Sequence, residues 1–198
     1  MNGHKKRRED KKLAILNTSF ELFTQYGFDR VTIAEIAEKA HVSKVSIYNF
    51  FESKENLRRI LIKDILDKGL MDITTVLKKK SNIRERMNEF IKYRVEYVKS
   101  TNFQLLFDGG QSDPEIKKSI TEYTTAYRQV LMDFIEEGQK TKAFSSDISR
   151  TAIAIFIDIF MSYYENPTQN KANLNLLQTD PVLSEELNML FWDGFIRD

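Results

Sequence analysis

Apolar side chains recur along this chain at intervals of three and four residues, the spacing that places them on one face of an α-helix. The pattern begins with Leu13, Leu16, Phe20 and Phe23 and stops at Gly27. It returns over residues 33–40, 47–51, 57–77, 83–98, 116–134, 153–161 and 183–195, with a short apolar piece at 103–107. No useful length alternates apolar and polar residues as a β-strand does. The pattern therefore predicts an all-α protein of about nine helices.

Residues that favour helix starts stand ahead of most of these runs. Thr32 followed by Glu35 is a capping box. The other predicted starts are Ser43, Ser53, Asp113-Pro114, Asp147 and Asp180-Pro181.

Residues 32–51, TIAEIAEKAHVSKVSIYNFF, contain two short predicted helices joined by a turn at His41-Val42. Neither helix is long enough to be stable alone, so the helix at 13–26 must supply the missing apolar surface. The second short helix buries Ile47 and turns small polar groups and one lysine outward. Such a face suits a helix that lies in the DNA major groove, and the unit reads as a helix-turn-helix.

The N-terminal residues resemble those of the TetR family of transcription regulators. The resemblance covers residues 11–60 and rests on Gly27, Thr32, Ile36-Ala37, Ala40, Val42-Ser43, Ile47-Tyr48-Asn49-Phe50-Phe51 and Ser53-Lys54-Glu55. It implies a DNA-binding domain with a basic N-terminal arm over residues 1–53, and an effector-binding and dimerisation domain over residues 54–198.

The resemblance also implies roles for individual residues. Base reading falls to Ser43, Lys44, Val45, Ser46 and Asn49, and phosphate binding to Thr32, Tyr48 and Lys54. Thr32 and Lys54 stand at predicted helix N-termini, where free N–H groups and the helix dipole favour an anion. The alternative is that Thr32 only caps its helix and Tyr48 only packs.

Two residues depart from the family pattern. His41 stands in the turn where the family usually has Gly, and His tolerates a positive φ at some cost. Val45 replaces a small residue on the side that faces the groove, where it can touch a thymine methyl. We expect an operator that differs from those of Gly-bearing relatives.

The C-terminal two thirds contain many aromatic residues on helical apolar faces. Core packing is the ordinary explanation for any one of them, but the resemblance implies a pocket for a small-molecule effector among the central helices. The effector-pocket candidates are Tyr93, Tyr97, Phe103, Phe107, Tyr123, Tyr127, Phe156 and Phe160. The family pairs its last two helices across a two-fold axis, and the corresponding dimer candidates here are Ile153, Ile157, Met161, Leu183, Leu187, Leu190 and Phe191.

Charge is distributed unevenly along the chain. The net charge is +1, but residues 1–63 carry thirteen Lys/Arg against eight Asp/Glu, a balance of +5. Residues 5–12, KKRREDKK, hold six of these basic groups. Alone this run is typical of a solvated tail, but its place just ahead of the helix-turn-helix favours a contact with DNA.

Composition argues against an enzyme. The chain has no Cys, and its two histidines, His4 and His41, lie far apart. A nucleophile–base pair or a metal cluster is therefore not visible, and we expect no catalytic residue, no metal and no cofactor. The apolar stretch 151–164 is too short to span a bilayer and no signal-peptide pattern occurs, so we expect a cytoplasmic protein with no membrane partner.

Together with these features, the resemblance implies a homodimeric regulator that represses from a palindromic operator in double-stranded DNA and is released by a partly apolar small molecule. Three alternatives remain open at this point. They are an activator of the same family, an architectural protein that binds DNA without sequence preference, and a helical enzyme.

Overall fold

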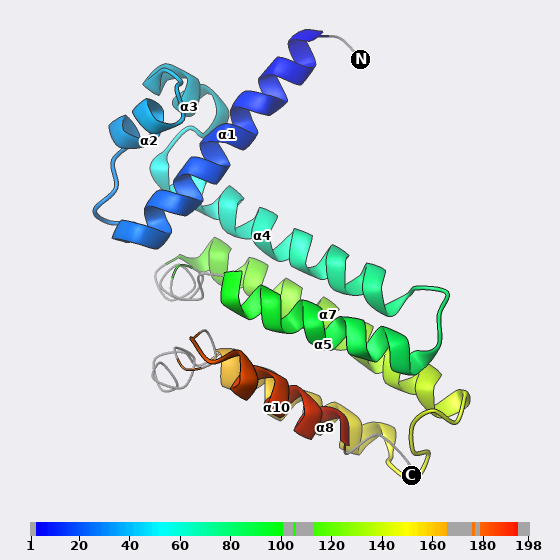
Figure 1. Ribbon diagram of the computed structural model, residues 1–198. Helices are drawn as coiled ribbons and strands as arrows, with labels where there is room; N and C mark the ends of the chain where they lie inside the picture. Colours follow the sequence, from blue (N-terminus) through cyan, green and yellow to red (C-terminus); the bar gives the residue numbers. More distant parts are fainter. Residues whose placement is uncertain (1–2, 101–104, 106–112, 166–175, 177–178, 194–198) are drawn as a thin grey trace. The chain divides into compact units, whose positions relative to one another are not determined.

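The computed structural model describes the whole chain except residues 1–2, 101–104, 106–112, 166–175, 177–178 and 194–198. The described residues form eight helices and no β-sheet (Figure 1). The helices are α1 (Gly3–Tyr26), α2 (Ile33–Lys39), α3 (Lys44–Phe51), α4 (Lys54–Leu77), α5 (Ile83–Ser100), α7 (Pro114–Lys140), α8 (Arg150–Glu165) and α10 (Pro181–Asp193). The all-α prediction is confirmed, and the predicted piece at 103–107 lies, apart from Leu105, outside the described residues.

The chain divides into two compact units, each with its own apolar core. The N-terminal unit consists of Met1–Leu66 together with Asn102–Ser119, and the C-terminal unit of Asp67–Thr101 together with Ile120–Asp198. The core of the N-terminal unit is built from Ile15, Leu16, Leu22, Phe23, Val31, Ile36, Ala37, Ile47, Phe51, Leu57, Leu61 and Leu105. Helices α1, α2 and α3 all contribute to it, as the short lengths of α2 and α3 require.

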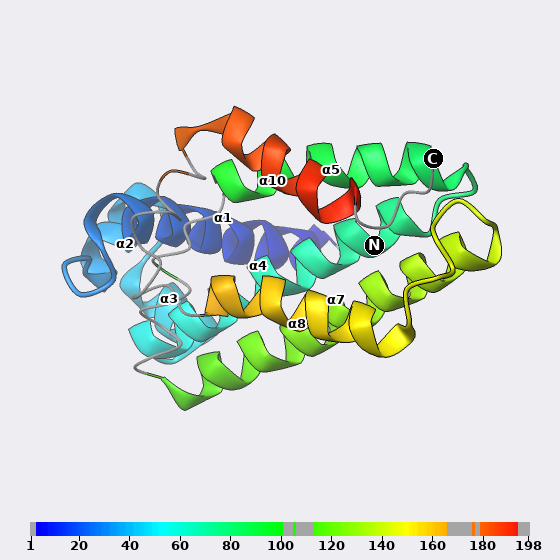
Figure 2. The same cartoon turned by 90° about the horizontal axis from the view of Figure 1, so that it is seen from below.

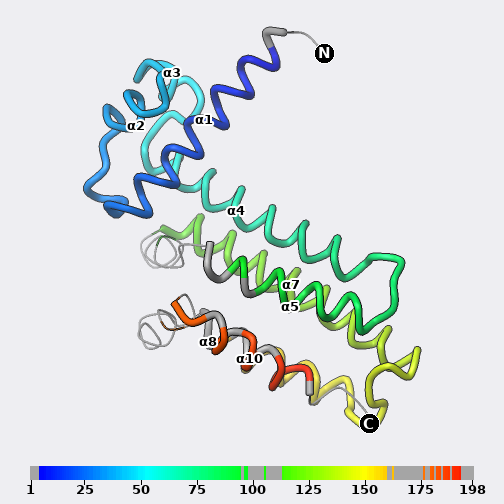
Figure 3. The backbone as a smooth tube through the Cα atoms, viewed as in Figure 1, coloured from blue at the N-terminus to red at the C-terminus, as the bar shows by residue number. Residues whose placement is uncertain are grey.

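Helix α1 is longer than the apolar pattern predicts. That pattern starts at Leu13, whereas the helix starts at Gly3 and runs without a break through the basic residues 5–12 (Figure 3). Lys, Arg and Glu are good helix formers, and neither Gly nor Pro interrupts residues 4–26. The basic run is therefore part of the same helix as the apolar residues that follow it.

Most predicted helix starts are confirmed by hydrogen bonds. Ser53 Oγ accepts from the Asn56 N–H at 3.0 Å, Asp113 Oδ1 from the Glu115 N–H at 3.0 Å, and Asp180 Oδ1 from the Val182 N–H at 3.0 Å. The predicted cap at Asp147 is wrong. Helix α8 starts three residues later, and Ser149 Oγ accepts from the Ala152 N–H at 3.1 Å.

The core of the C-terminal unit is rich in aromatic rings. Trp192 of α10 is 1% exposed, and its ring centroid lies 5.0–5.8 Å from those of Phe90, Phe134, Phe144 and Phe191. In Figure 2, α10 lies beside α5 and α8 beside α7. Arg128 of α7 pairs with Asp158 of α8 at 2.5 Å, which ties the second of these pairs together.

Within the described residues, no helix is both long enough and apolar enough to cross a membrane.

Candidate nucleic-acid interface

The turn between α2 and α3 depends on a left-handed residue. His41 has φ +53°, as expected for the position where the family pattern has Gly. The Val42 N–H donates to the Ala37 carbonyl at 2.9 Å and closes the end of α2. Helix α3 then begins two residues after this turn, with Ser43 as its N-cap.

Helix α3 has one buried face and one exposed face. Ile47 and Phe51 are 1% and 0% exposed in the core of the N-terminal unit. Two large side chains on the opposite face are well exposed, Val45 at 66% and Tyr48 at 49%. Lys44 and Asn49 are exposed beside them. The structure therefore brings together on one surface four residues that the sequence assigns to DNA.

Ser43 and Ser46 are bonded to each other. Ser43 Oγ accepts from the Ser46 N–H at 3.1 Å and lies 2.9 Å from Ser46 Oγ. Ser43 therefore caps α3, and Ser46 is half-buried. A base contact from either hydroxyl must share an oxygen that already has a partner within the helix.

Thr32 is engaged in the predicted capping box. Its N–H and its hydroxyl both donate to Glu35 Oε2 at 2.7 Å, and its Oγ1 accepts from the Glu35 N–H at 3.3 Å. The hydrogen bonds from Thr32 hold the pKa of the Glu35 carboxyl below its usual value. The Thr32 hydroxyl thus donates its hydrogen bond to the Glu35 carboxylate. To bind a phosphate, that hydroxyl must give up this hydrogen bond and donate to the phosphate instead.

Lys54, the first residue of α4, is held against the turn that follows α1. Its Nζ lies 4.2 Å from the centroid of the Phe28 ring and 3.5 Å from the carbonyl oxygen of Asp29. Burial lowers the pKa of Lys54, against the raising effect of the Asp29 and Glu55 charges. Phe28 also stacks on the Arg58 guanidinium, 3.9 Å from the ring centroid, so one ring supports two cations.

A groove beside α3 is lined by basic residues that the helix-turn-helix pattern does not identify. Arg7, Arg8, Asp10 and Lys11 of α1 face Ser46, Asn49 and Phe50 of α3 across it. The basic run at 5–12 is the feature of the sequence that points to this groove. Which of its side chains face α3 is known only once the run is seen to be helical.

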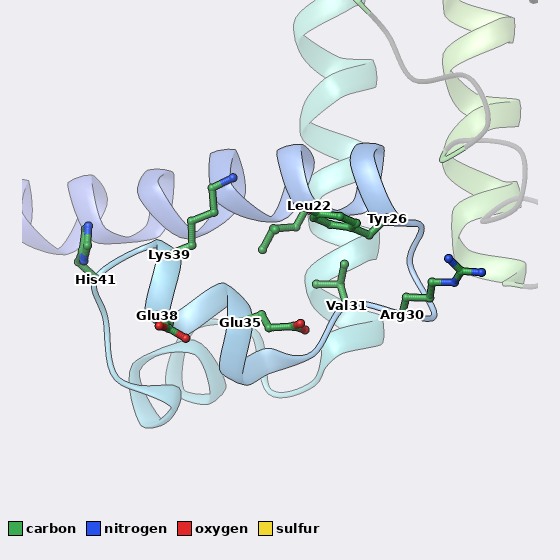
Figure 4. Close-up of a pocket in the computed structure, with 8 residues that line it drawn as sticks. All are labelled: Leu22, Tyr26, Arg30, Val31, Glu35, Glu38, Lys39 and His41. Atoms are coloured by element: carbon green, nitrogen blue, oxygen red, sulfur yellow. The ribbon is translucent and has the colours of Figure 1, made fainter.

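A second hollow of the N-terminal unit lies between α1 and α2, with residues from both helices and from the turns around them (Figure 4). Glu35 and Glu38 of α2, Arg30 and Lys39 line it together with Tyr26. Lys39 pairs with Glu21 of α1 at 3.1 Å. The lining of this hollow carries both acidic and basic side chains, and it contains none of the residues predicted to contact DNA.

The C-terminal unit brings four of the predicted effector-pocket residues together. Tyr93 and Tyr97 of α5 stack at 5.9 Å between ring centroids, and Tyr123 and Tyr127 of α7 stack at 5.8 Å. Arg94 Nη1 donates to the Tyr127 hydroxyl at 2.5 Å, so the two helices meet through these side chains.

Burial has a large effect on the ionisation of two of these phenols. It raises the pKa of Tyr93, to which the charge of Asp72 adds, and it raises the pKa of Tyr123 well above the usual value. Both hydroxyls therefore stay protonated in alkaline solution as well as near pH 7, and a protonated phenol can act as a donor and as an acceptor.

Two neighbours of these tyrosines are not identified by the apolar pattern. A Cβ at Gly69 of α4 would lie 3.0 Å from the Tyr97 ring, so the glycine makes room for it. Arg94 is the other neighbour. The sequence feature that could have identified it is a charged residue between two tyrosines on one helix.

Phe156, another effector-pocket candidate, packs away from these four tyrosines. Phe156 is 41% exposed and packs on Phe191 at 5.2 Å between centroids. Phe103, Phe107 and the side chain of Phe160 lie outside the described residues.

Three of the predicted dimer residues lie in the core of their own chain. Ile153, Ile157 and Phe191 are 1%, 0% and 5% exposed, because the apolar stripe of α8 and the end of α10 pack on α5 and α7. These three are therefore corrected from interface to core. Leu190 is 70% exposed, Leu183 and Leu187 are half-buried, and the side chain of Met161 lies outside the described ones.

The exposed apolar side chains of α8 and α10 are a different set. They are Ile155, Phe156 and Ile159 of α8 and Val182, Met189 and Leu190 of α10. We call this set the α8/α10 patch.

Comparison with known proteins identifies the helix-turn-helix region. The sequence pattern of the family described as bacterial regulatory proteins, tetR family, matches residues 15–59. The HTH-type transcriptional regulator RutR of Escherichia coli is 42% identical over 57 residues, which are 29% of this chain and 27% of RutR. The HTH-type transcriptional activator FasR of Mycolicibacterium smegmatis is 22% identical over 160 residues, 79% of this chain and 73% of FasR.

Solved structures share the fold over nearly the whole chain. A transcriptional regulator from Saccharomonospora viridis in complex with choline has a TM-score of 0.74 at 14% identity and covers 94% of this chain and 98% of that one. FadR of Bacillus subtilis in complex with stearoyl-CoA has a TM-score of 0.62 at 20% identity and covers 92% of this chain and 98% of that one. The helix-turn-helix and its supporting core agree with these comparisons: residues 15–59 belong to the tetR family of bacterial regulatory proteins, and the helical C-terminal unit has the fold of the solved regulators.

Proposed function

We propose that the protein is a homodimeric repressor that binds a palindromic operator and leaves it when a small molecule binds the C-terminal unit. Residues 1–53 carry the DNA-binding helices, with Lys54 at their edge, and residues 54–198 carry the effector and dimer functions. Such a regulator acts in the cytoplasm, on chromosomal DNA.

The observation that carries this proposal is the exposed face of α3. Lys44, Val45, Tyr48 and Asn49 are exposed on a helix whose other face is fully buried, so the helix can enter a groove without losing its support. Two such helices of a dimer, about 34–36 Å apart, meet successive major grooves. A dimer thereby doubles the number of bases that are read.

The test begins with selection of genomic fragments by the purified protein, which yields the operator. Lys44→Ala and Tyr48→Ala should then weaken operator binding by about 10–100-fold at fixed salt, because the first removes a proposed base contact and the second a proposed phosphate contact from the exposed face of α3. Lys68→Ala, an exposed lysine of α4, is the matched control and should bind as the wild type does.

Sedimentation and circular dichroism should show an unchanged dimer and fold in all three variants. Wild-type affinity of Lys44→Ala and Tyr48→Ala would remove α3 from the DNA interface.

Effector binding rests on the cluster of Tyr93, Tyr97, Tyr123, Tyr127 and Arg94. Aromatic walls with a few polar groups are typical of small-molecule sites. The similar folds that hold choline and stearoyl-CoA support a small molecule in this unit, although those ligands are properties of those proteins. The effector releases DNA only through a difference in its affinity for the bound and the free state.

Activation is the second candidate function, because FasR is named an activator. A reporter behind the selected promoter distinguishes the two. Repression predicts that deletion of the regulator raises reporter output, and activation predicts that it lowers it.

A third candidate, an architectural protein without sequence preference, is tested by competition. A regulator should prefer its operator over random DNA by about 10³ or more. Equal competition by random DNA would favour the architectural protein.

A further inference from the structure

The basic residues at the start of α1 occupy fixed positions. They belong to a continuous helix that also supplies Ile15, Leu16 and Phe23 to the core of the N-terminal unit. Arg7, Arg8 and Lys11 are spaced so that all three project from one side of this helix. That side faces α3 across the groove of about 740 Å³ described above.

Arg8 is held in this groove by an aromatic ring. Its guanidinium lies 5.5 Å from the centroid of Phe50, the residue after Asn49 on α3. A cation over an aromatic face is attracted without being neutralised, so Arg8 keeps its charge for another partner. Within the described part of the chain, neither Arg8 nor Lys11 forms an ion pair.

The lining of the groove has the charge and the position that a DNA backbone requires. Three of the four α1 residues that line it are basic and one, Asp10, is acidic. The opposite wall contains Asn49, which is exposed on the proposed base-reading face. A DNA strand in contact with that face therefore has its phosphates next to the mouth of the groove.

We propose that this groove between α1 and α3 is a second DNA contact, which binds the sugar–phosphate backbone of the strand beside α3. Arg8 is its pre-positioned cation, and Arg7 and Lys11 hold neighbouring phosphates. This proposal rests on the proposed function, since it assumes that α3 meets DNA. Phosphate contacts carry affinity and register but no base sequence.

The salt dependence of binding tests the groove directly. The double variant Arg7→Ala/Lys11→Ala should lower the slope of log K against log salt by about two and weaken binding about tenfold near physiological salt, equally for the operator and for random DNA. Phe50→Leu keeps an apolar side chain but removes the ring under Arg8, and should weaken binding by a smaller factor in the same uniform way.

Lys5→Ala/Lys6→Ala is the matched control. It removes the same charge from the same helix, at two exposed residues that do not line the groove. This pair should change the slope by much less than the groove pair does. Equal slopes for the two pairs, or a wild-type slope for Arg7→Ala/Lys11→Ala, would overturn the proposal.

The two proposals fail in different ways. Loss of operator preference on Lys44→Ala with an unchanged slope in the groove variants would remove the groove and leave α3 as the reading helix. Absence of any operator preference in the wild type, with a slope that still falls in the groove variants, would remove the sequence-specific function and leave the groove as a DNA contact.

Discussion

His41 adopts a backbone conformation that L-residues other than Gly rarely take. Its φ of +53° places the side chain close to its own carbonyl, a conformation that is unfavourable by about 1 kcal/mol. The turn between α2 and α3 nevertheless needs it, because no other residue separates Ala40, the C-cap of α2, from Val42 and the cap of α3.

His41→Gly should leave the free energy of unfolding unchanged or raise it by up to about 1 kcal/mol, with a Tm up to about 3 °C higher. Glycine relieves the strain at positive φ, and its greater freedom in the unfolded chain offsets part of the gain. Urea unfolding followed by circular dichroism measures the free energy of unfolding, and thermal unfolding followed in the same way measures the Tm.

Lys142→Gly is a matched comparison, since Lys142 has φ +60° in the C-terminal unit. We expect the same sign there. A clear loss of stability in His41→Gly alone would show that the imidazole ring makes a stabilising contact in the hollow of Figure 4.

At the level of helices, sequence succeeds where local chemistry decides and fails where tertiary packing does. Proline after aspartate marks the starts of α7 and α10 correctly, because cap and first turn act locally. Gly138 shows the other case: it lies inside α7, and the Phe144 ring packs where a Cβ would be. No local pattern predicts that contact.

The same holds for the proposed DNA interface. The outward face of α3 follows from helical spacing, so Lys44 and Asn49 are predictable. The partnership of Arg8 with Phe50 is not, because it joins two helices more than forty residues apart in the chain.

The start of α7 is joined to the start of α4 by one buried carboxylate. Asp113 is 5% exposed, accepts from Arg59 Nε at 2.8 Å and lies 4.0 Å from Arg58. Burial works against its ionisation, but the hydrogen bond from Arg59 and those from the Glu115 and Ile116 N–H groups hold the pKa of Asp113 below its usual value.

Asp113→Asn should lower the free energy of unfolding by about 2 kcal/mol at pH 7, because it keeps an acceptor for the cap but removes the charge opposite two arginines. A lowered folded-state pKa stabilises the protein above the unfolded value of about 4, and this stabilisation is lost as the pH falls through the folded value. The difference between the variant and the wild type should therefore shrink below about pH 4.

Urea titrations at several pH values measure this difference, and Asp64→Asn, an exposed residue of α4, is the control. A difference that stays constant from pH 7 into the acid range would show that the charge of Asp113 contributes nothing.

For the molecule as a whole, the α8/α10 patch is the surface that we expect to form the proposed dimer interface. Ile159 is 64% and Leu190 70% exposed, and the contact of Phe156 with Phe191 shows that the two helices are neighbours. Contiguous exposed apolar side chains are typical of interaction sites, and an isologous dimer covers such a patch on both subunits at once.

Ile159→Glu and Leu190→Glu should convert the proposed dimer to a monomer, since each places a charge in the exposed apolar patch that we expect the dimer to cover. Sedimentation velocity measures the change, and operator affinity should fall with it because half-sites are then bound singly. Met71→Glu replaces an apolar residue of α4 that is 62% exposed and should stay dimeric. A dimer that survives both substitutions would place the interface elsewhere.

The N-terminal unit is made from two separate stretches of the chain, since Leu105 lies in its core and Asp113 pairs with Arg59. Domain exchange between regulators therefore has a practical limit in this protein. A chimera joined after residue 66 would lack Leu105 and Asp113, leaving Arg59 without its carboxylate and exposing Leu57 and Leu61, which pack in the same core as Leu105. A transplantable DNA-reading module must bring the 102–119 stretch from the same parent.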